Sequence, residues 1–433
     1  MELFKTTSSG EPRKMQLHLK TILNYVEKHK SFVYQATALE TAGGQPRVVV
    51  WMAPRGNGRP VCSGCDHVRP GYDTLPEREF QYVPLWGIPV FLVYALRRVN
   101  CPACGVKVER VPWANGKSRL TNSYRWFLAD WAKRLSWQET ARVFHTSWET
   151  VFRAARMAVR WGLKHRSLQG IKAIGVDEVQ YRRGHRYLTL VYQIDGSAKR
   201  LLYIAPDRTK ASLRGFFKIL NKQQKASIQF VCSDMWRAYL SVLKKHLGHA
   251  VHVLDRFHIM KKMNEALDKV RAAEVKQLKA DGYEPVLTHA RWCILKRREN
   301  LTQKQALKLQ EILKYNLKTA RSLLMKVDFQ RFWEYRSLGC ARRFLKEWCT
   351  RALRSRIAPM KKVAQMLRTH ETLILNWFKA EGTISSGAVE GLNNKLKVVT
   401  RKAYGFRTYE AAEIALFHAL GNLPVPESTH RFS

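Results

Sequence analysis

The stretch "IKAIGVDEVQYRRGHRYLTLVYQID", residues 171–195, contains two apolar runs typical of buried strands, and the acid pair Asp177-Glu178 stands directly after the first. The surrounding chain is very basic, with 76 Lys and Arg against 34 Asp and Glu. A basic protein that only holds a polyanion has no use for carboxylates at the end of a strand. Their position therefore favours chemistry carried out on a polyanion.

Length and charge limit the class of protein. A chain of 433 residues is too long for one ordinary core, so two to four domains are expected. Hydrophobic residues make up 45% and aromatic residues 11%, which is typical of packed domains rather than disorder. The net charge of +42 indicates an acidic partner. Nucleic acid is the first candidate, and an anionic membrane surface is the second.

Membrane insertion and secretion are not expected. The apolar run "IPVFLVYAL", residues 88–96, is about half the ~18 residues needed to span a bilayer. The first residues, "MELFKTTSSGEPRK", lack the apolar centre of a signal peptide. We therefore expect a cytoplasmic protein whose eight cysteines stay reduced.

The pattern of polarity predicts five consecutive segments. Residues 33–112 have β-branched and aromatic runs divided by Gly and Pro, residues 120–165 have helical periodicity, and residues 171–257 alternate strands with helices. Three neighbouring strands followed by alternating strands and helices predict a mixed sheet covered by helices. Residues from about 257 to 380 read as helical and very basic, and residues 384–422 contain a Gly- and Asn-marked segment before a last helix.

Two cysteine pairs predict a metal site. Cys62 and Cys65 form one C-x2-C pair, Cys101 and Cys104 form another, and 35 residues lie between the pairs. Four thiolates from two tight turns suit one tetrahedral Zn²⁺ ion, provided that the 35 residues form a β-hairpin. The alternative is a set of reduced structural or redox cysteines. His67 is expected to be a surface residue, and Cys232, Cys293, Cys340 and Cys349 are expected to be buried.

Residues 123–162 fit three short helices, as in a helix-turn-helix domain. Ser136 with Glu139 makes a capping box for the second helix, and Ser147 can cap the third. A recognition helix enters the major groove with basic residues on phosphate or guanine. The exposed positions predicted for that role are Trp148, Arg153, Arg156 and Arg160. An ordinary helical bundle with a basic face is the alternative.

Three acids are candidates for a catalytic site. Asp177 closes one apolar run and Asp234 closes another, so a shared sheet would bring both to the same rim. Glu390, in a helical stretch, is the best third acid. Three such carboxylates can hold two Mg²⁺ or Mn²⁺ ions about 4 Å apart, as in phosphodiester displacement. On spacing alone, Glu178 or Asp195 could replace Asp177.

The chain resembles a bacterial transposase of the ISL-three type, a branch of the DDE transposases, over nearly its whole length. The motifs that carry the resemblance are "CSGC", "VPLWGIPVFLVYALRRVNCPACG", "GVDE", "CSDMWRAY", "VLDRFHIMKKMNEALDKVR", "LKRRENLT" and "AVEGLNNKLKVVTRKAYGFR". The last block and "DRFH" are the most specific. The resemblance implies a catalytic core with an RNase H-like fold, whose acids map to Asp177, Asp234 and Glu390.

The resemblance also implies a domain order. Because 155 residues separate Asp234 from Glu390, far more than a bare core needs, the helical stretch reads as an insertion in the catalytic fold. The fold class is multidomain α+β. The expected segments are a zinc-binding β module at 1–115, a helix-turn-helix domain at 116–168, the first part of an RNase H-like core at 169–259, an all-helical insertion at 260–380, and the second part of the core at 381–433.

Further residues are expected near the site and on DNA. His258 either assists at the metals or scissile phosphate, as the resemblance implies, or packs the helix start. Trp236 is expected to pack in the core, with stacking on an unpaired base as the alternative, and the same choice holds for Trp333, Trp348 and Trp377. A basic run beside Glu390 is expected to contact phosphates without reading sequence. It comprises Asn394, Lys395, Lys397, Arg401, Lys402 and Arg407.

The sequence is therefore interpreted as a DNA transposase that binds inverted repeats and performs metal-dependent strand cleavage and strand transfer. Its partners are double-stranded DNA at the element's ends and at the target, and a second copy of the chain, giving a homodimer or higher when DNA is bound. The expected cofactors are two Mg²⁺ or Mn²⁺ ions and one structural Zn²⁺ ion. Two alternatives remain, a non-catalytic DNA-binding regulator and an RNase H-like nuclease without strand transfer. The expected location is the bacterial cytoplasm, at the nucleoid.

Overall fold

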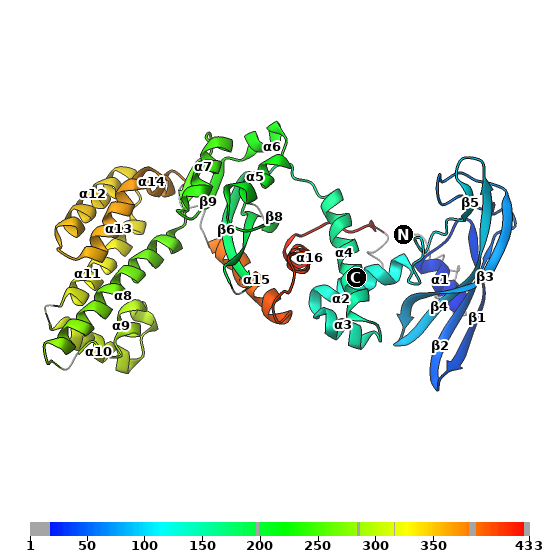
Figure 1. The fold of residues 1–433 in the computed structure, drawn as a ribbon, viewed down its shortest axis with the longest axis horizontal. Coiled ribbons are helices and arrows are strands. Elements are labelled where there is room, and N and C mark those ends of the chain that lie inside the picture. The colour runs from blue at the N-terminus through cyan, green and yellow to red at the C-terminus, as the bar shows by residue number, and fades with distance from the viewer. Residues whose placement is uncertain are drawn as a thin grey trace, which may run out of the picture. The chain divides into compact units, whose positions relative to one another are not determined.

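The computed structural model describes residues 18–182, 184–195, 199–283, 286–315, 317–380 and 387–427. The chain divides into two compact units, residues 1–165 with 423–433, and residues 166–422. The described part of the chain contains sixteen α-helices and two mixed five-stranded sheets (Figure 1). The prediction of a multidomain chain with both helices and sheets is confirmed at this level.

The first unit is built around a twisted sheet. Its elements are α1 (Leu19–Val26), β1 (Phe32–Ala42), β2 (Gln45–Pro54), β3 (Gly71–Leu85), β4 (Ile88–Cys101) and β5 (Gly105–Val108). The strand order is β1-β2-β4-β3, with β5 paired to β4, and the β2–β4 pair is parallel while the others are antiparallel. Trp86 and Gly87 form the turn between β3 and β4, both with positive φ, as tight hairpins require. This hairpin is the one predicted between the cysteine pairs.

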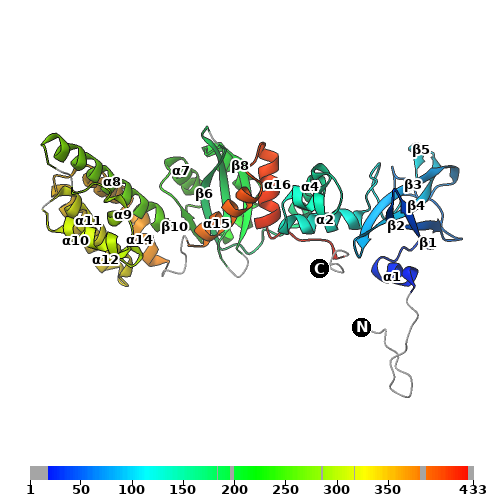
Figure 2. The ribbon, with the colours of Figure 1, turned by 90° about the horizontal axis from the view of Figure 1, so that it is seen from below.

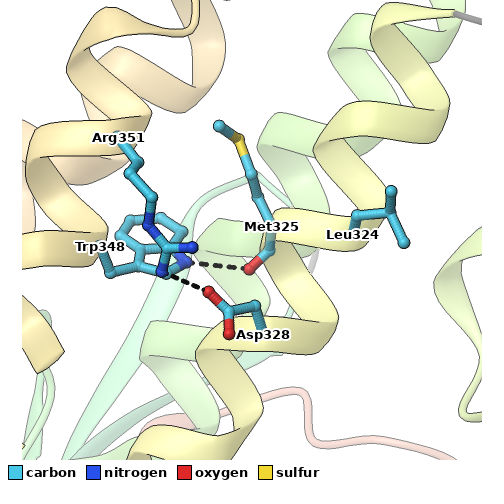
Figure 3. Close-up of a pocket in the computed structure, with 5 residues that line it drawn as sticks. All are labelled: Leu324, Met325, Asp328, Trp348 and Arg351. Carbon is cyan, nitrogen blue, oxygen red and sulfur yellow. Dashed lines mark hydrogen bonds and ion pairs between the residues drawn. The ribbon is translucent and has the colours of Figure 1, made fainter.

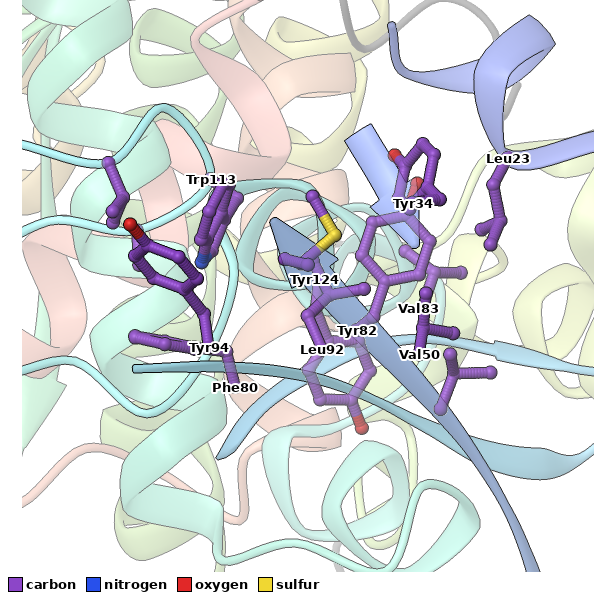
Figure 4. Packing of buried hydrophobic residues seen from close by; sticks show 14 of the residues in the cluster. Leu23, Tyr34, Val50, Phe80, Tyr82, Val83, Leu92, Tyr94, Trp113 and Tyr124 are labelled. Carbon is purple, nitrogen blue, oxygen red and sulfur yellow. The ribbon is translucent and has the colours of Figure 1, made fainter. Parts of the chain in front are cut away.

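Trp113 anchors the core of the first unit, where the sheet packs on α1 and α2. Its indole is fully buried, and Phe32, Tyr94 and Phe80 meet it edge-on at ring-centroid distances of 4.9, 5.5 and 6.2 Å. Figure 4 shows Trp113, Tyr94 and Phe80 together, with Tyr124 from the helical segment in the same cluster. Edge-to-face aromatic pairs of this kind add to the stabilisation from burial.

Three helices complete the first unit. They are α2 (Asn122–Arg134), α3 (Trp137–Val143) and α4 (Trp148–His165). The predicted capping box is confirmed, because Ser136 Oγ accepts from Glu139 N while Glu139 accepts from Ser136 N. Ser147 Oγ likewise accepts from Thr150 N at 3.2 Å at the start of α4.

The second unit contains the sheet foreseen for residues 171–257. Its strands are β6 (Ala173–Arg182), β7 (Arg186–Gln193), β8 (Arg200–Pro206), β9 (Phe230–Ser233) and β10 (Val251–Leu254). The order is β10-β9-β6-β7-β8. Strands β6, β7 and β8 form an antiparallel meander, whereas β9 and β10 run parallel to β6, with helical crossovers before them. The prediction of a mixed sheet is confirmed.

Helices cover both faces of this sheet. Helices α5 (Lys210–Lys218) and α7 (Arg237–His246) pack on the face that carries Ile174, Val176 and Val191. Helices α15 (Gly387–Lys402) and α16 (Tyr409–Leu420) lie on the opposite face, as Figures 1 and 2 show. A short helix, α6 (Lys222–Ser227), precedes β9.

Between β10 and α15 the described residues are mainly helical. The elements are α8 (Arg256–Ala280), α9 (Arg291–Leu295), η1 (Arg298–Asn300), α10 (Gln303–Leu313), α11 (Lys318–Gln330), η2 (Arg331–Glu334), α12 (Leu338–Arg354), α13 (Ala358–Thr369) and α14 (Glu371–Lys379). Asn376 Nδ2 donates to His252 O at 2.9 Å, which ties α14 to β10. No helix in the described ranges combines the length and apolar character needed to cross a bilayer.

Candidate active site and cysteine centre

Three aspartates lie side by side at the carboxyl edge of the second sheet. Val176, Ser233 and Leu254 are register partners on the parallel strands β6, β9 and β10. An aspartate follows each of them, namely Asp177, Asp234 and Asp255. Neighbouring strands are about 4.8 Å apart, so the register delivers three carboxylates to one short row. The sequence placed Asp177 at a strand end, but β6 continues to Arg182 because β7 still pairs with it.

Asp177 is held by backbone and side-chain donors. It is buried, its Oδ1 accepts from Glu178 N at 2.8 Å, and its Oδ2 accepts from Asn393 Nδ2 on α15. Asn393 Oδ1 in turn accepts from Tyr192 Oη at 2.9 Å, which fixes the amide's orientation. Burial raises the pKa of Asp177, while His258 and the two hydrogen bonds act in the opposite direction. A nearby cation would therefore stabilise the ionised form of this buried carboxylate.

Asp234 begins the turn between β9 and α7. Its Oδ1 accepts from Trp236 N at 3.0 Å, which aims the side chain at the sheet edge. Burial raises the pKa of Asp234, and nearby Asp255 raises it further, against the Trp236 amide, His258 and Arg208. Asp234 and Asp177 therefore share the same charged neighbours.

Asp255 and His258 form a pair at the start of α8. Asp255 Oδ1 accepts from Phe257 N at 2.7 Å and caps the helix, while its Oδ2 lies 2.9 Å from His258 Nδ1. Burial alone would lower the pKa of His258, but the hydrogen bond and charge of Asp255, together with Asp177 and Asp234, raise it. The sequence analysis missed Asp255 as a site acid, although its place after the apolar run "AVHVL" was the available signal.

Glu178 joins the group from the other face of the sheet, since successive strand residues point to opposite sides. Burial, followed by the charges of Asp234 and Asp177, raises its pKa to about 7. Its Oε1 lies 3.8 Å from Arg208 Nη1, and its Oε2 is buried with no hydrogen-bond partner in the described part of the chain. We call Asp177, Glu178, Asp234 and Asp255 the carboxylate cluster.

Glu390 lies on α15, the helix that packs on β6 beside the cluster. Val389 packs so closely on Gly175 of β6 that an added Cβ at Gly175 would lie 2.5 Å from Val389 Cγ2. Asn393, one turn later, contacts Asp177. Glu390 sits between these two contacts in sequence, in the exposed part of the first turn of α15. The described coordinates record no bond between Glu390 and the carboxylate cluster.

Asp195, the alternative to Asp177, lies elsewhere. Its Oδ2 accepts from Lys172 N at 3.0 Å, just before β6 begins. Because β7 runs antiparallel to β6, Asp195 is at the opposite edge of the sheet from the carboxylate cluster. The structure therefore separates Asp195 from Asp234, whereas Glu178 lies close enough to Asp234 for its charge to be affected.

The carboxylate cluster fits hard divalent cations in its donor chemistry. Mg²⁺ takes oxygen ligands and usually keeps several waters, using one or two carboxylates plus substrate phosphate. Glu178 Oε2 is buried without a hydrogen-bond partner in the described part of the chain, and burial raises the pKa values of Asp177 and Asp234, so a bound cation would stabilise their ionised forms. The residues that could hold such ions are Asp177 and Asp234, next to Glu178 and Asp255.

Four cysteine sulfurs converge in the first unit. The Sγ atoms of Cys62, Cys65, Cys101 and Cys104 lie within 4.8 Å of one another. The Cys65 and Cys101 sulfurs are 3.6 Å apart, close to the ~3.8 Å edge of a tetrahedral site with Zn–S bonds of about 2.3 Å. Their donor set fits Zn²⁺. His67 is exposed and its Nδ1 lies 2.7 Å from Cys65 O, as expected for a surface histidine.

The surroundings favour a thiolate at Cys101, whereas burial and the neighbouring cysteines raise the pKa of Cys104 to about 12. Burial would raise the pKa of Cys101, but the backbone amides of Ala103 and Cys104 and the neighbouring thiols lower it to about 6. The pKa of Arg69 is raised because its guanidinium lies beside the sulfurs of Cys101 and Cys65. A cation next to sulfur ligands offsets part of their negative charge.

Helix α4 presents the residues proposed for DNA on one side. Trp148 is 53% exposed, Arg153 and Arg160 are exposed, and Arg156 lies with its guanidinium 5.4 Å from the Phe152 ring centroid. Arg153 also approaches Glu149, at 3.8 Å. Arg153, Arg156 and Arg160 recur at helical spacing, so they form one stripe, and Trp148 lies outside it at the start of α4. On α15 and the loop after it, Asn394, Lys395, Lys397, Arg401 and Arg407 are exposed, and Lys402 is half-buried.

Trp333, Trp348 and Trp377 pack in the core of the helical segment. Trp348 is fully buried and its Nε1 donates to Met325 O at 3.0 Å, as Figure 3 shows. Trp348 lines a hollow of about 210 Å³ together with Leu324, Met325, Asp328 and Arg351. Trp333 is 7% exposed and packs edge-on against Trp377. The core-packing alternative is the one observed.

Two expectations about single residues are wrong. Trp236 was expected in the core, but it is 40% exposed because it is the residue before α7 at the rim of the carboxylate cluster. Cys340 was expected to be buried, but it lies exposed in the first turn of α12. The other three unpaired cysteines, Cys232, Cys293 and Cys349, are buried as predicted.

Comparison with known proteins gives the family. A family model described as "Transposase", of the DDE ISL3 group, matches residues 174–416. The transposase for insertion sequence element IS1001 of Bordetella parapertussis is 30% identical over 354 residues, which is 81% of this chain and 86% of that protein. The transposase for insertion sequence element IS1557 of Mycobacterium tuberculosis is 28% identical over 418 residues, covering 90% of this chain and 93% of the relative. The chain therefore belongs to the ISL3-type insertion-sequence transposases.

Proposed function

We propose that the chain binds the inverted repeats of its insertion sequence and catalyses DNA strand cleavage followed by strand transfer at the carboxylate cluster. The observation that carries the proposal is the row of Asp177, Asp234 and Asp255 after register partners on three parallel strands, in a chain of a transposase family. Ligands bind outside the carboxyl ends of strands in open α/β sheets. On this proposal, the sheet from β6 to β10 with α15 is an RNase H-like core.

The proposed site uses two Mg²⁺ or Mn²⁺ ions, which activate the attacking oxygen and stabilise the leaving oxygen when bound. Asp177 and Asp234 are the proposed principal ligands, and Glu390 is the proposed third, from α15. Asn393 and the Glu178 amide hold Asp177 in one orientation. Asp255 raises the pKa of His258 through its hydrogen bond and charge, and His258 is the proposed partner of the scissile phosphate.

The same arrangement serves two reactions. First, water attacks the phosphodiester at the element's end and frees a 3′-hydroxyl. That hydroxyl then attacks a target phosphodiester, so that one P–O bond forms as another breaks. No covalent intermediate with the protein is required. Because two ends must be joined, we propose a homodimer or higher assembly on DNA, acting in the bacterial cytoplasm at the nucleoid.

End recognition falls to the first unit in this proposal. A Zn²⁺ ion held by Cys62, Cys65, Cys101 and Cys104 fixes the turns at the end of the β3–β4 hairpin. The helices α2 to α4 act as a helix-turn-helix domain, and Trp148 and the stripe of Arg153, Arg156 and Arg160 face DNA. The basic run on α15 holds phosphates beside the carboxylate cluster, and the helical segment from α8 to α14 is an insertion in the core.

The test is cleavage of a labelled duplex that carries the element's end, with Mg²⁺ and with EDTA. Wild type, Asp177→Asn, Asp234→Asn and Glu390→Gln are compared with Asp195→Asn, a matched change at the opposite edge of the same sheet. We expect metal-dependent nicking at the end, lost in the first three variants and kept in the fourth, with end binding retained throughout. Specific binding without nicking of a paired end would support a DNA-binding regulator instead. Nicking without joining to target would support a nuclease.

A further inference from the structure

Arg208 stands at the rim of the carboxylate cluster in a position that the sequence did not single out. It lies between β8 and α5, after Asp207 with φ +63° and before Thr209, the N-cap of α5. Its guanidinium carbon is 4.3 Å from the centroid of the Tyr187 ring and 5.1 Å from that of Trp236. The planar group is therefore positioned by two aromatic rings from β7 and from the start of α7.

Arg208 is coupled by charge to two members of the carboxylate cluster. Its Nη1 lies 3.8 Å from Glu178 Oε1, and its charge lowers the pKa values of Glu178 and Asp234 against their burial. The other cation acting on these two acids is His258, which Asp255 already engages at 2.9 Å. In the part of the chain that the structure describes, Arg208 thus approaches the cluster through one long contact, the 3.8 Å between its Nη1 and Glu178 Oε1.

The hydrogen-bonding groups of Arg208 remain available. A guanidinium carries five N–H donors, and 3.8 Å is too long for a hydrogen bond to Glu178. The described coordinates record no hydrogen bond from the Arg208 side chain, which is 39% exposed. Stacking against rings orients a guanidinium while leaving its N–H edge open to a planar or tetrahedral anion.

We propose that Arg208 is a phosphate-binding residue of the active site, which holds the backbone of the bound DNA strand beside the carboxylate cluster. The proposal rests on the function proposed above. The negative charge of a phosphodiester is repelled by the four carboxylates of the cluster. The positively charged guanidinium of Arg208, with its N–H donors, offsets this repulsion. Arg208 exchanges its long contact with Glu178 for short, charge-assisted hydrogen bonds to phosphate oxygens. Lysine cannot reproduce the geometry, because it has no planar group to lie on Tyr187 and Trp236.

The test compares Arg208→Ala and Arg208→Lys with the matched change Arg214→Ala, an exposed arginine on α5. Single-turnover cleavage of the end duplex is measured for each variant. Loss of one preorganised donor group costs about 10²–10³-fold in rate in comparable sites. We expect a loss of this size for Arg208→Ala, a loss of at least about tenfold for Arg208→Lys, and a change of less than about twofold for Arg214→Ala.

Neutral methylphosphonate linkages, placed one at a time around the cleavage position, separate phosphate binding from a structural role. At the linkage that Arg208 contacts, wild type and Arg208→Ala should cleave at the same reduced rate, because the partner charge is gone. Equal rates of wild type and Arg208→Ala on natural DNA would overturn the proposal, as would an unchanged rate ratio at every modified linkage.

A failure of the proposed function gives a different result. If the wild-type protein does not nick DNA with Mg²⁺ or Mn²⁺, strand cleavage is refuted. The Arg208 proposal is then tested by the salt dependence of DNA affinity. In that case the slope of log affinity against log salt should fall by about 0.9 in Arg208→Ala and stay unchanged in Arg214→Ala. An unchanged slope in Arg208→Ala would refute phosphate contact.

Discussion

Replacing Gly175 with alanine tests how α15 is seated on β6. An alanine Cβ would lie 2.5 Å from Val389 Cγ2 and 3.2 Å from Ile194 Cγ2. Ordinary carbon contacts are ~3.5 Å or more, so α15 or β6 must shift by about 1 Å. Overpacking of this kind costs about 1–3 kcal/mol. The shift also moves Asn393 away from Asp177, and a misplacement of about 1 Å at a reacting centre can lower the rate about 10²-fold.

The measurement combines urea unfolding followed by near-ultraviolet circular dichroism with single-turnover cleavage of the end duplex. Gly391→Ala is the matched control, because Gly391 is on the same helix and a Cβ there meets nothing within 4 Å. It should leave cleavage unchanged and stabilise by up to about 1 kcal/mol, since alanine favours helix over glycine. Adding Val389→Ala to Gly175→Ala should recover most of the lost rate. Full stability and full activity of Gly175→Ala would refute the close packing of α15 on β6.

Three further predictions concern other parts of the chain. Cys104→Ser should reduce bound zinc from one ion per chain to none, as measured by mass spectrometry of the metal. The control Cys340→Ser, at an exposed cysteine, should keep the zinc. Equal zinc content in the two variants would contradict a four-cysteine site. Burial lowers the pKa of Lys326 to about 8. Between pH 8 and ~10.5 the folded state therefore binds fewer protons than the unfolded state, and the free energy of unfolding should rise with pH. In urea titrations at several pH values, Lys326→Met should abolish this rise. Glu109→Ala should lower the unfolding free energy of the first unit by about 3–5 kcal/mol, because it removes the carboxylate that lies 2.7 Å from the Arg97 guanidinium. A loss under ~1 kcal/mol would show that this ion pair contributes little to stability.

The features that local sequence encodes were predicted well. The capping box of Ser136 and Glu139 needs only four consecutive residues, and the structure contains it. The hairpin between Cys65 and Cys101 follows from alternating apolar residues around a tight turn. Asp177 and Asp234 end apolar runs, so their approach to one rim follows from the rule that strands of a sheet share their edges.

The features that depend on distant partners were missed. Arg208 sits in a connection whose composition is unremarkable, and the rings that hold it, Tyr187 and Trp236, come from β7 and from the start of α7. Asp255 caps α8, and only the register of β10 against β9 shows that it also continues the row of aspartates. Trp113 gives no periodic signal, although it is the centre of the first core.

The hydrogen bond between Asn393 and Asp177 joins residues 216 positions apart, and this has a consequence for synthesis on the ribosome. At ~5–20 residues per second, roughly 10–40 s pass between translation of Asp177 and of Asn393. During that interval the four cysteines and helices α2 to α4 are already available to fold, while α15 does not yet exist. A chain released early would thus carry the parts proposed to hold DNA but lack Glu390 and the contact that orients Asp177. On the function proposed above, such a fragment binds DNA ends without cutting them and competes with the finished protein.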